Sequence, residues 1–109
     1  METVKIAQTH DVLPGQMKKF AAGGRNVLLA NVGGTFLALD DKCPHLGGSL
    51  SAGKLEGGRV TCPRHGASFD VATGRNVGNA KIAFVSIRVD DATSYKVRVE
   101  GSDVLVEIG

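Results

Sequence analysis

Hydrophobic and polar residues alternate along much of this 109-residue chain, and a period of two predicts β-strands. The stretches 85–89 and 95–99 each place Val, Ile or Tyr at every second position. The segment DDATS between them, at 90–94, has the composition of a turn. We therefore expect the two stretches to pair as an antiparallel hairpin with one buried and one solvent-exposed face.

Further strands are predicted towards both ends of the chain. A second turn signal, EGSD at 100–103, leads into a final apolar stretch. Gly33 and Gly34 separate two other apolar stretches and suit a two-residue hairpin turn. No stretch carries a helical stripe of ten or more residues, so we expect an all-β fold, an antiparallel sandwich or barrel. The strands predicted in this way lie around Val4 and Ile6 and over 16–22, 27–32, 35–39 and 104–108.

The middle of the chain, from about 41 to 78, differs in kind. It is rich in Gly, holds two of the three prolines and has few consecutive apolar residues. Gly and Pro give the backbone the conformations that loops need, and loops on a rigid scaffold often carry function. We expect one domain over residues 1–109 in which 41–78 is a small loop-rich subdomain, not an independent second domain.

Composition excludes several classes of protein. With 42% hydrophobic residues, 22% charged residues and a net charge of +2, the chain is typical of a soluble globular domain. Basic residues are scattered and Trp is absent, so we expect no nucleic-acid partner. No apolar run approaches the roughly 18 residues of a membrane span, and no secretory signal is visible. A cytoplasmic protein is predicted, in which cysteines more often bind metal or stay as thiols than form a disulfide.

A repeated motif carries the candidate chemistry. CPHLG at 43–47 resembles CPRHG at 62–66, so Cys43 and Cys62 each have a nearby histidine, His45 and His65 respectively. Sixteen residues separate His45 from Cys62. Two thiolates and two imidazoles make a four-ligand set for a transition metal, which could hold one tetrahedral zinc ion or a two-iron cluster.

Simpler interpretations explain less of the pattern. The remaining histidine, His10, has no such context and is interpreted as an ordinary surface residue. A Cys43–Cys62 disulfide, or two unliganded thiols, would leave both motif histidines unexplained. Structural zinc sites usually pair like residues, as C-x(2-4)-C and H-x(3-5)-H, and this chain does not.

The two motifs resemble the C-x-H and C-x-x-H ligand motifs of Rieske iron–sulfur proteins. The likeness extends through SLSAGKLEGGRVTCPRHGASFDVATGR to the small Rieske ferredoxins of bacterial aromatic-ring dioxygenases, and it is strongest over about 40–75. The resemblance implies a Rieske-like all-β fold in which 41–78 binds one [2Fe–2S] cluster per chain. It also implies that Cys43 and Cys62 bind the inner iron as thiolates, while His45 and His65 bind the outer iron.

The function that the resemblance implies is one-electron transfer. The partners would be a flavin-dependent ferredoxin reductase and a terminal Rieske oxygenase. The chain itself would not be an enzyme, because such oxygenases add a mononuclear iron on two histidines and a carboxylate, and only His10 remains. Two alternatives stay open: a small Rieske subunit of an assimilatory nitrite reductase, and a zinc-stabilised interaction module.

The resemblance also implies a low reduction potential. High-potential Rieske proteins of respiratory chains carry Ser and Tyr hydroxyls where this chain has Ala67 and Phe69, which cannot donate hydrogen bonds. They carry a bracing cysteine pair where this chain has Gly48 and Arg64. We therefore expect a value near the lower end of the roughly −150 to +300 mV range of Rieske centres.

Two further expectations concern the surface around the motifs. The segment 75–94 is longer than in the relatives and lacks their usual proline; in those proteins it covers the cluster and borders the docking face. Arg64, between two of the ligands, is expected to be exposed near the point where the electron leaves. The charged residues in and beside the loops are interpreted as a mixed, solvated surface. They are Lys42, Lys54, Arg59, Arg64, Arg75, Asp40, Asp41, Glu56 and Asp70.

Overall fold

The computed structural model describes residues 2–44, 48–64, 66–78, 80–82, 85–87 and 89–108. Within these ranges the regular structure consists of β-strands and two 3-10 helices, η1 (Thr9–Asp11) and η2 (Leu50–Ala52). None of the helices found there is long and apolar enough to span a membrane. The all-β prediction is therefore confirmed. The strands are β1 (Glu2–Gln8), β2 (Met17–Ala22), β3 (Arg25–Val32), β4 (Thr35–Asp40), β5 (Lys54–Glu56), β6 (Arg59–Thr61), β7 (Ser68–Asp70), β8 (Asn76–Gly78), β9 (Ala80–Ile82), β10 (Val85–Ile87), β11 (Ser94–Tyr95), β12 (Val97–Glu100) and β13 (Asp103–Ile108).

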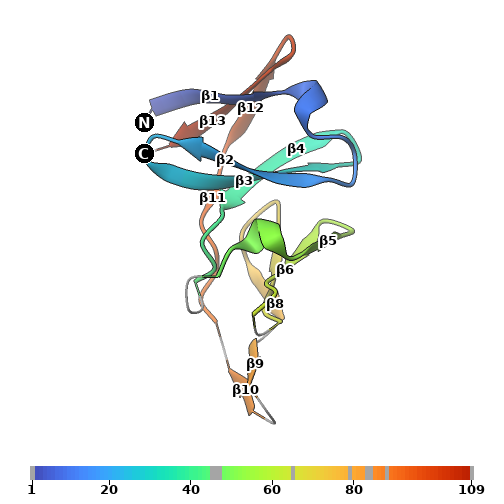
Figure 1. The fold of residues 1–109 in the computed structure, drawn as a ribbon, viewed down its shortest axis with the longest axis vertical. Coiled ribbons are helices and arrows are strands. Elements are labelled where there is room, and N and C mark those ends of the chain that lie inside the picture. Colours follow the sequence, from blue (N-terminus) through green and yellow to red (C-terminus); the bar gives the residue numbers. More distant parts are fainter. Residues whose placement is uncertain are drawn as a thin grey trace.

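The described strands form four sheets, of which the three larger ones lie one above another along the long axis of the molecule (Figure 1). The first has the order β1-β13-β12, the second β11-β4-β3-β2 and the third β5-β6-β7-β8. A two-stranded ribbon of β9 and β10 lies beyond the third sheet, at the end farthest from the chain termini (Figure 1). The second sheet is thus the central layer.

Strand β3 is buried on both faces, which explains the unbroken apolar run at 27–30. Val27 and Leu29 belong to the core between the first and second sheets. Leu28 and Ala30 belong to the core on the opposite side, which the third sheet covers. All four side chains are 0% exposed. A strand covered on both faces needs apolar residues at every position instead of alternation, so this run marks the middle of the molecule.

The predicted β3–β4 hairpin is confirmed. Val32 pairs with Thr35 across the two-residue loop. Gly33 and Gly34 have φ angles of 61° and 96°, a left-handed conformation that glycine adopts without steric cost and that a primed hairpin turn requires. The last predicted strand is also confirmed, because β12 and β13 pair around the turn that begins at Gly101.

The predicted hairpin between 85–89 and 95–99 is wrong. Strand β10 pairs with β9, whereas β11 pairs with β4 and β12 with β13. The intervening segment is not a local turn, because its backbone bonds distant residues: Ala92 N–H donates to Gly74 (2.7 Å), and Asp40 N–H donates to Thr93 (2.8 Å). The chain changes sheet after Tyr95, and Val99 is 44% exposed instead of buried.

The segment 41–78 is also more regular than a loop. It contains η2 and the four strands of the third sheet, each of them three residues long. Three residues are too few for an alternating pattern to stand out from the sequence, which is why these strands were not predicted. The third sheet holds the candidate ligand loops against the central layer.

Candidate metal centre

The first cysteine motif is held by a narrow antiparallel pairing just after β4. Lys42 and Ser49 form a β-bridge, and Leu50 N–H donates to Asp41 O at 2.8 Å. Nearer the tip, Cys43 N–H donates to Gly48 O at 2.6 Å. These bonds close a short loop that begins at Cys43 and returns at Gly48.

The second motif forms a matching loop between β6 and β7. Thr61 and Ser68 pair at its base, and their hydroxyl oxygens lie 3.0 Å apart. Cys62 N–H donates to Ala67 O at 2.8 Å, and Gly66 N–H donates to Cys62 O at 3.2 Å. In both motifs, then, the cysteine N–H bonds the carbonyl five residues further on, so the sequence repeat is also a structural one.

The two loops contact each other. A Cβ atom placed on Gly48 would lie 3.2 Å from Cys62 Sγ and 3.2 Å from Arg64 Cδ. Cys43 and Cys62 are 0% and 2% exposed and belong to the same buried cluster. They do not form a disulfide. Glycine at position 48 therefore leaves room around the second sulfur that any other residue would fill.

The remaining two predicted ligands, His45 and His65, lie outside the described residues, so their role as ligands stays a prediction. His10 lies outside both cysteine motifs, in η1. Its side chain is 70% exposed, and its Nε2 atom is 3.6 Å from Asp11 Oδ1. In the part of the chain that the structure describes, no group of three or more His, Cys, Asp or Glu side chains is arranged to hold a metal ion. Of the four predicted ligands, the described residues therefore include only the two cysteines, Cys43 and Cys62, and their role as ligands is likewise a prediction.

The donors present fit an iron–sulfur cluster well. Buried sulfurs on two adjacent loops, with space beside one of them, suit a cofactor that is bound by thiolates on one side. Their surroundings are apolar, since the same cluster includes Leu50, Val60 and Phe69. A dry, apolar shell limits solvent access, which influences the potential of a metal centre.

The end of the segment 75–94 packs beside the first loop. Val89 and Ala92 are each 6% exposed and belong to the cluster that contains both cysteines. A hollow next to them is lined by Cys43 and Pro44 on one side and by Asp90 and Asp91 on the other. In this region the segment therefore lies beside the first cysteine motif.

The prediction of a solvated surface is wrong for one of the charged residues. The basic side chains of Lys42, Lys54, Arg59, Arg64 and Arg75 are exposed as expected. Asp41, however, is only 4% exposed. Its burial was not foreseen because its neighbours in sequence, Asp40 and Lys42, are accessible and nothing in the local pattern distinguishes them.

An exposed polar chain lies near the base of the first loop. Arg25 Nη1 donates to the Tyr95 hydroxyl at 3.3 Å, and the resulting interaction raises the pKa of Arg25. The Tyr95 hydroxyl in turn donates to Asp40 Oδ2 at 3.5 Å, and Asp40 Oδ1 accepts from Lys42 N–H at 3.1 Å. These contacts tie β3 and β11 to the strand end that leads into Cys43.

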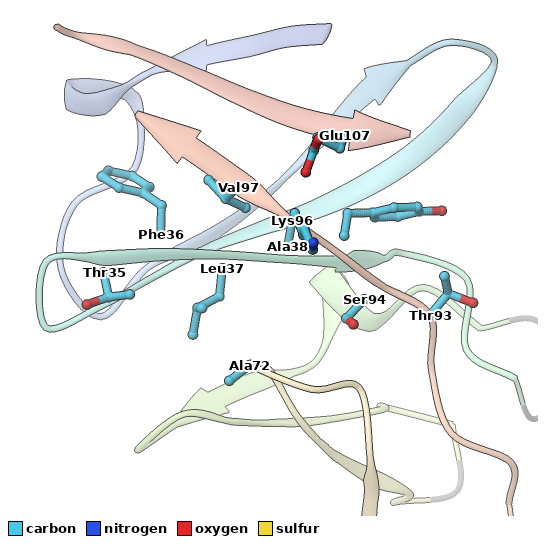
Figure 2. A pocket seen from close by; sticks show the side chains of 11 residues that line it. Thr35, Phe36, Leu37, Ala38, Ala72, Thr93, Ser94, Lys96, Val97 and Glu107 are labelled. Carbon is cyan, nitrogen blue, oxygen red and sulfur yellow. The ribbon is translucent and has the colours of Figure 1, made fainter. Parts of the chain in front are cut away.

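A separate hollow lies away from the cysteines, between β4 and the β11–β12 segment (Figure 2). Leu37 and Ala72 face each other across its lower side, with Phe36 and Val97 above (Figure 2). Neither Cys43 nor Cys62 lines it. Its lining brings no group of polar side chains to one point, so we assign it no chemistry.

Comparison with known proteins identifies the family. The Rieske [2Fe-2S] domain family matches residues 2–86. The biphenyl 2,3-dioxygenase ferredoxin component of Rhodococcus jostii (strain RHA1) is 40% identical over 108 residues, which cover 99% of this chain and 94% of that protein.

Solved structures agree in fold. The ferredoxin of carbazole 1,9a-dioxygenase from Nocardioides aromaticivorans IC177 has a TM-score of 0.83 and 26% identity, covering 97% of each chain. A complex of reduced oxygenase and oxidised ferredoxin in carbazole 1,9a-dioxygenase matches with a TM-score of 0.79 and 30% identity, over 95% of this chain and 91% of that one. These relatives confirm the resemblance to dioxygenase ferredoxins. The chain belongs to the Rieske [2Fe-2S] domain family, as an electron carrier with one [2Fe–2S] cluster and not an enzyme.

Proposed function

We propose that this ferredoxin passes single electrons from a flavin-dependent reductase to the terminal oxygenase of an aromatic-ring dioxygenase system, in the cytoplasm. Its similarity to the biphenyl 2,3-dioxygenase ferredoxin component, along almost the whole length of both chains, supports this assignment. The structurally similar complex of reduced oxygenase with oxidised ferredoxin supports the oxygenase as the electron acceptor.

We further propose that Cys43, His45, Cys62 and His65 hold the cluster, and that 41–78 is the subdomain which binds it. The observation that supports this ligand set best is the matched closure of the two loops. Cys43 and Cys62 each bond the carbonyl five residues ahead, and the loops touch where Gly48 meets Cys62 Sγ. Each histidine belongs to one of these loops.

The protein would act mainly by placing the two ends of the site in different surroundings. When bound, the cluster supplies a one-electron redox couple. Leu50, Val60 and Phe69 exclude water on the cysteine side. The residues beside the histidines, among them Pro44, Pro63 and Arg64, are exposed. Electrons would therefore enter and leave at the histidine end, where a partner can approach.

Substitution of single ligands tests the proposed set. Each of Cys43→Ala, His45→Ala, Cys62→Ala and His65→Ala should abolish or gravely impair cluster assembly, because each iron has only two protein ligands. Iron and sulfide content, the visible spectrum and the electron paramagnetic resonance signal of the reduced protein measure this. A His10→Ala variant serves as the control and should keep the full spectrum. Native spectra in His45→Ala and His65→Ala would refute the ligand assignment.

The role as a shuttle is tested by purification from the native host without a tag. A freely eluting protein of about 11.3 kDa, which a separate flavoprotein reduces in the presence of a nicotinamide cofactor, is the expected result. Permanent co-elution with a large catalytic chain would instead favour the nitrite reductase subunit.

A further inference from the structure

Asp41 is a buried acid at the base of the first loop, two residues before Cys43. It is 4% exposed, although it follows an accessible strand end. Among the described residues, no Lys, Arg or His nitrogen forms an ion pair with it. Acids this deeply buried are rare unless they are paired or hydrogen bonded, so the position requires a specific explanation.

Both oxygens of Asp41 accept hydrogen bonds. Ser49 Oγ donates to Oδ2 at 2.6 Å, and Ser51 N–H donates to Oδ1 at 2.8 Å. A side chain whose two oxygens both accept has the pattern of a carboxylate, not of a carboxylic acid. The 2.6 Å distance lies in the range of charge-assisted O–H···O⁻ bonds. The contacts therefore indicate a buried negative charge.

The same residue also ties the two sides of the loop together. Asp41 N–H donates to Asn26 O in β3 at 3.0 Å, and Asp41 O accepts from Leu50 N–H at 2.8 Å. With its side-chain bonds, Asp41 thus fastens the returning residues 49–51 to the strand that leads into Cys43. The hold on the returning strand and the local negative charge therefore meet at one residue.

We propose that Asp41 is a positioning residue that also lowers the reduction potential of the cluster through its buried charge. The inference rests on the proposed function, since it takes Cys43 as a ligand. Reduction adds one electron, and a fixed negative charge nearby disfavours that addition. Water and salt screen an exposed charge, but they screen a buried one much less.

The expected size of the effect follows from the short path to the ligand. Two residues of chain span at most about 7 Å, so the Asp41 and Cys43 backbones lie closer together than the roughly 8–10 Å over which salt screens charges. For unit charges about 10 Å apart at an effective dielectric constant near 20, the Coulomb energy corresponds to roughly a tenfold change in an equilibrium constant.

The Asp41→Asn variant tests the charge while keeping the shape of the side chain. At a fixed electrode potential its ratio of reduced to oxidised protein should rise about tenfold, which for one electron is about 59 mV. The electron paramagnetic resonance signal should stay that of the native cluster. Raising the salt concentration should leave most of the shift in place.

Asp90→Asn is the matched control. Asp90 lines the same hollow as Cys43 but is exposed. Removing the Asp90 charge should change the ratio of reduced to oxidised protein by less than about threefold at low salt. The change should be smaller still at high salt, because solvent screens this charge.

The Ser49→Ala variant tests the same inference independently, in case Asp41→Asn does not assemble. It keeps the Asp41 carboxylate but removes the hydrogen-bond donor that offsets part of its negative charge. The reduction potential of the cluster should therefore fall instead of rise. An unchanged potential in both variants, or shifts in the same direction, would overturn the proposal while the cluster is still present. Failure of the ligand assignment has a different signature, because it shows as native spectra in the histidine variants.

Discussion

Ala67 and Phe69 lie in the same buried cluster as both cysteines, at 1% and 0% exposure. Ala67 also accepts the backbone hydrogen bond from Cys62. These two positions are therefore next to the ligand loops, where donors to the cluster sulfurs would act. Neither side chain carries a donor, which is the residue-level reason for expecting a low potential.

Adding the missing hydroxyls should raise the potential. Hydrogen bonds to cluster sulfurs stabilise the more negative reduced state, so the double variant Ala67→Ser, Phe69→Tyr should be easier to reduce than the wild type. Direct voltammetry at pH 7 measures both proteins. A wild-type value above about +100 mV, in the upper part of the range for Rieske centres, would contradict this account.

At the scale of the elements, the second ligand loop depends on close packing between η2 and β6. Gly53 follows η2, and its N–H donates to Leu50 O at 3.0 Å. A Cβ atom placed on Gly53 would collide with the Thr61 carbonyl oxygen and lie 3.2 Å from Pro63 Cδ. Thr61 ends β6 and directly precedes Cys62, so any shift there moves a proposed ligand.

Gly53→Ala should therefore destabilise the protein and loosen the second loop. We expect a loss of about 1–3 kcal/mol, the usual cost of overpacking, together with faster release of iron. Thermal unfolding and the decay of the visible spectrum measure the two effects. Gly101→Asn is the control, because a Cβ at Gly101 meets nothing within 4 Å and Asn tolerates its left-handed backbone. Equal melting temperatures for the two variants would disprove the packing argument.

At the scale of the whole molecule, the three sheets form a body that carries the ligand loops away from the termini (Figure 1). Arg64 is exposed on the second loop, and its stem lies against Gly48 of the first. Its charge is therefore accessible to solvent beside the proposed ligand loops, where we expect a partner to approach. Charges at the rim of an interface act mainly on the association rate.

Reversing this charge should slow electron transfer to the terminal oxygenase. For Arg64→Glu we expect a reduction of about tenfold in the second-order rate constant at low salt, and a smaller one at high salt, because salt screens exposed charges. Stopped-flow mixing of reduced ferredoxin with oxidised oxygenase measures it. Arg64→Gln keeps a similar stem without the charge, and its rate constant should lie between those of the wild type and Arg64→Glu. If the variants and the wild type have the same rate constant at every ionic strength, Arg64 is not part of the docking surface.

Local patterns in the sequence were sufficient to predict the long strands and the nature of the cofactor. Val4 and Ile6 indicated β1, a turn signal followed by an apolar stretch indicated β13, and two adjacent glycines predicted the β3–β4 turn. The two cysteine motifs indicated the family, because the spacing within each motif is a local property of the chain. These features depend on residues that are close in sequence.

Tertiary structure decided the features that depend on distant partners. The backbone of 92–93 bonds Gly74 and Asp40, and for that reason β10 does not pair with the stretch 95–99, as the alternating patterns had indicated. Asp41 is buried because Asn26, Ser49 and Ser51 surround it. Alternation along a strand reports that one face is covered, but it carries no information on which strand lies alongside or which polar side chain the fold encloses. Those outcomes depend on hydrogen bonds and packing that form only when remote segments meet.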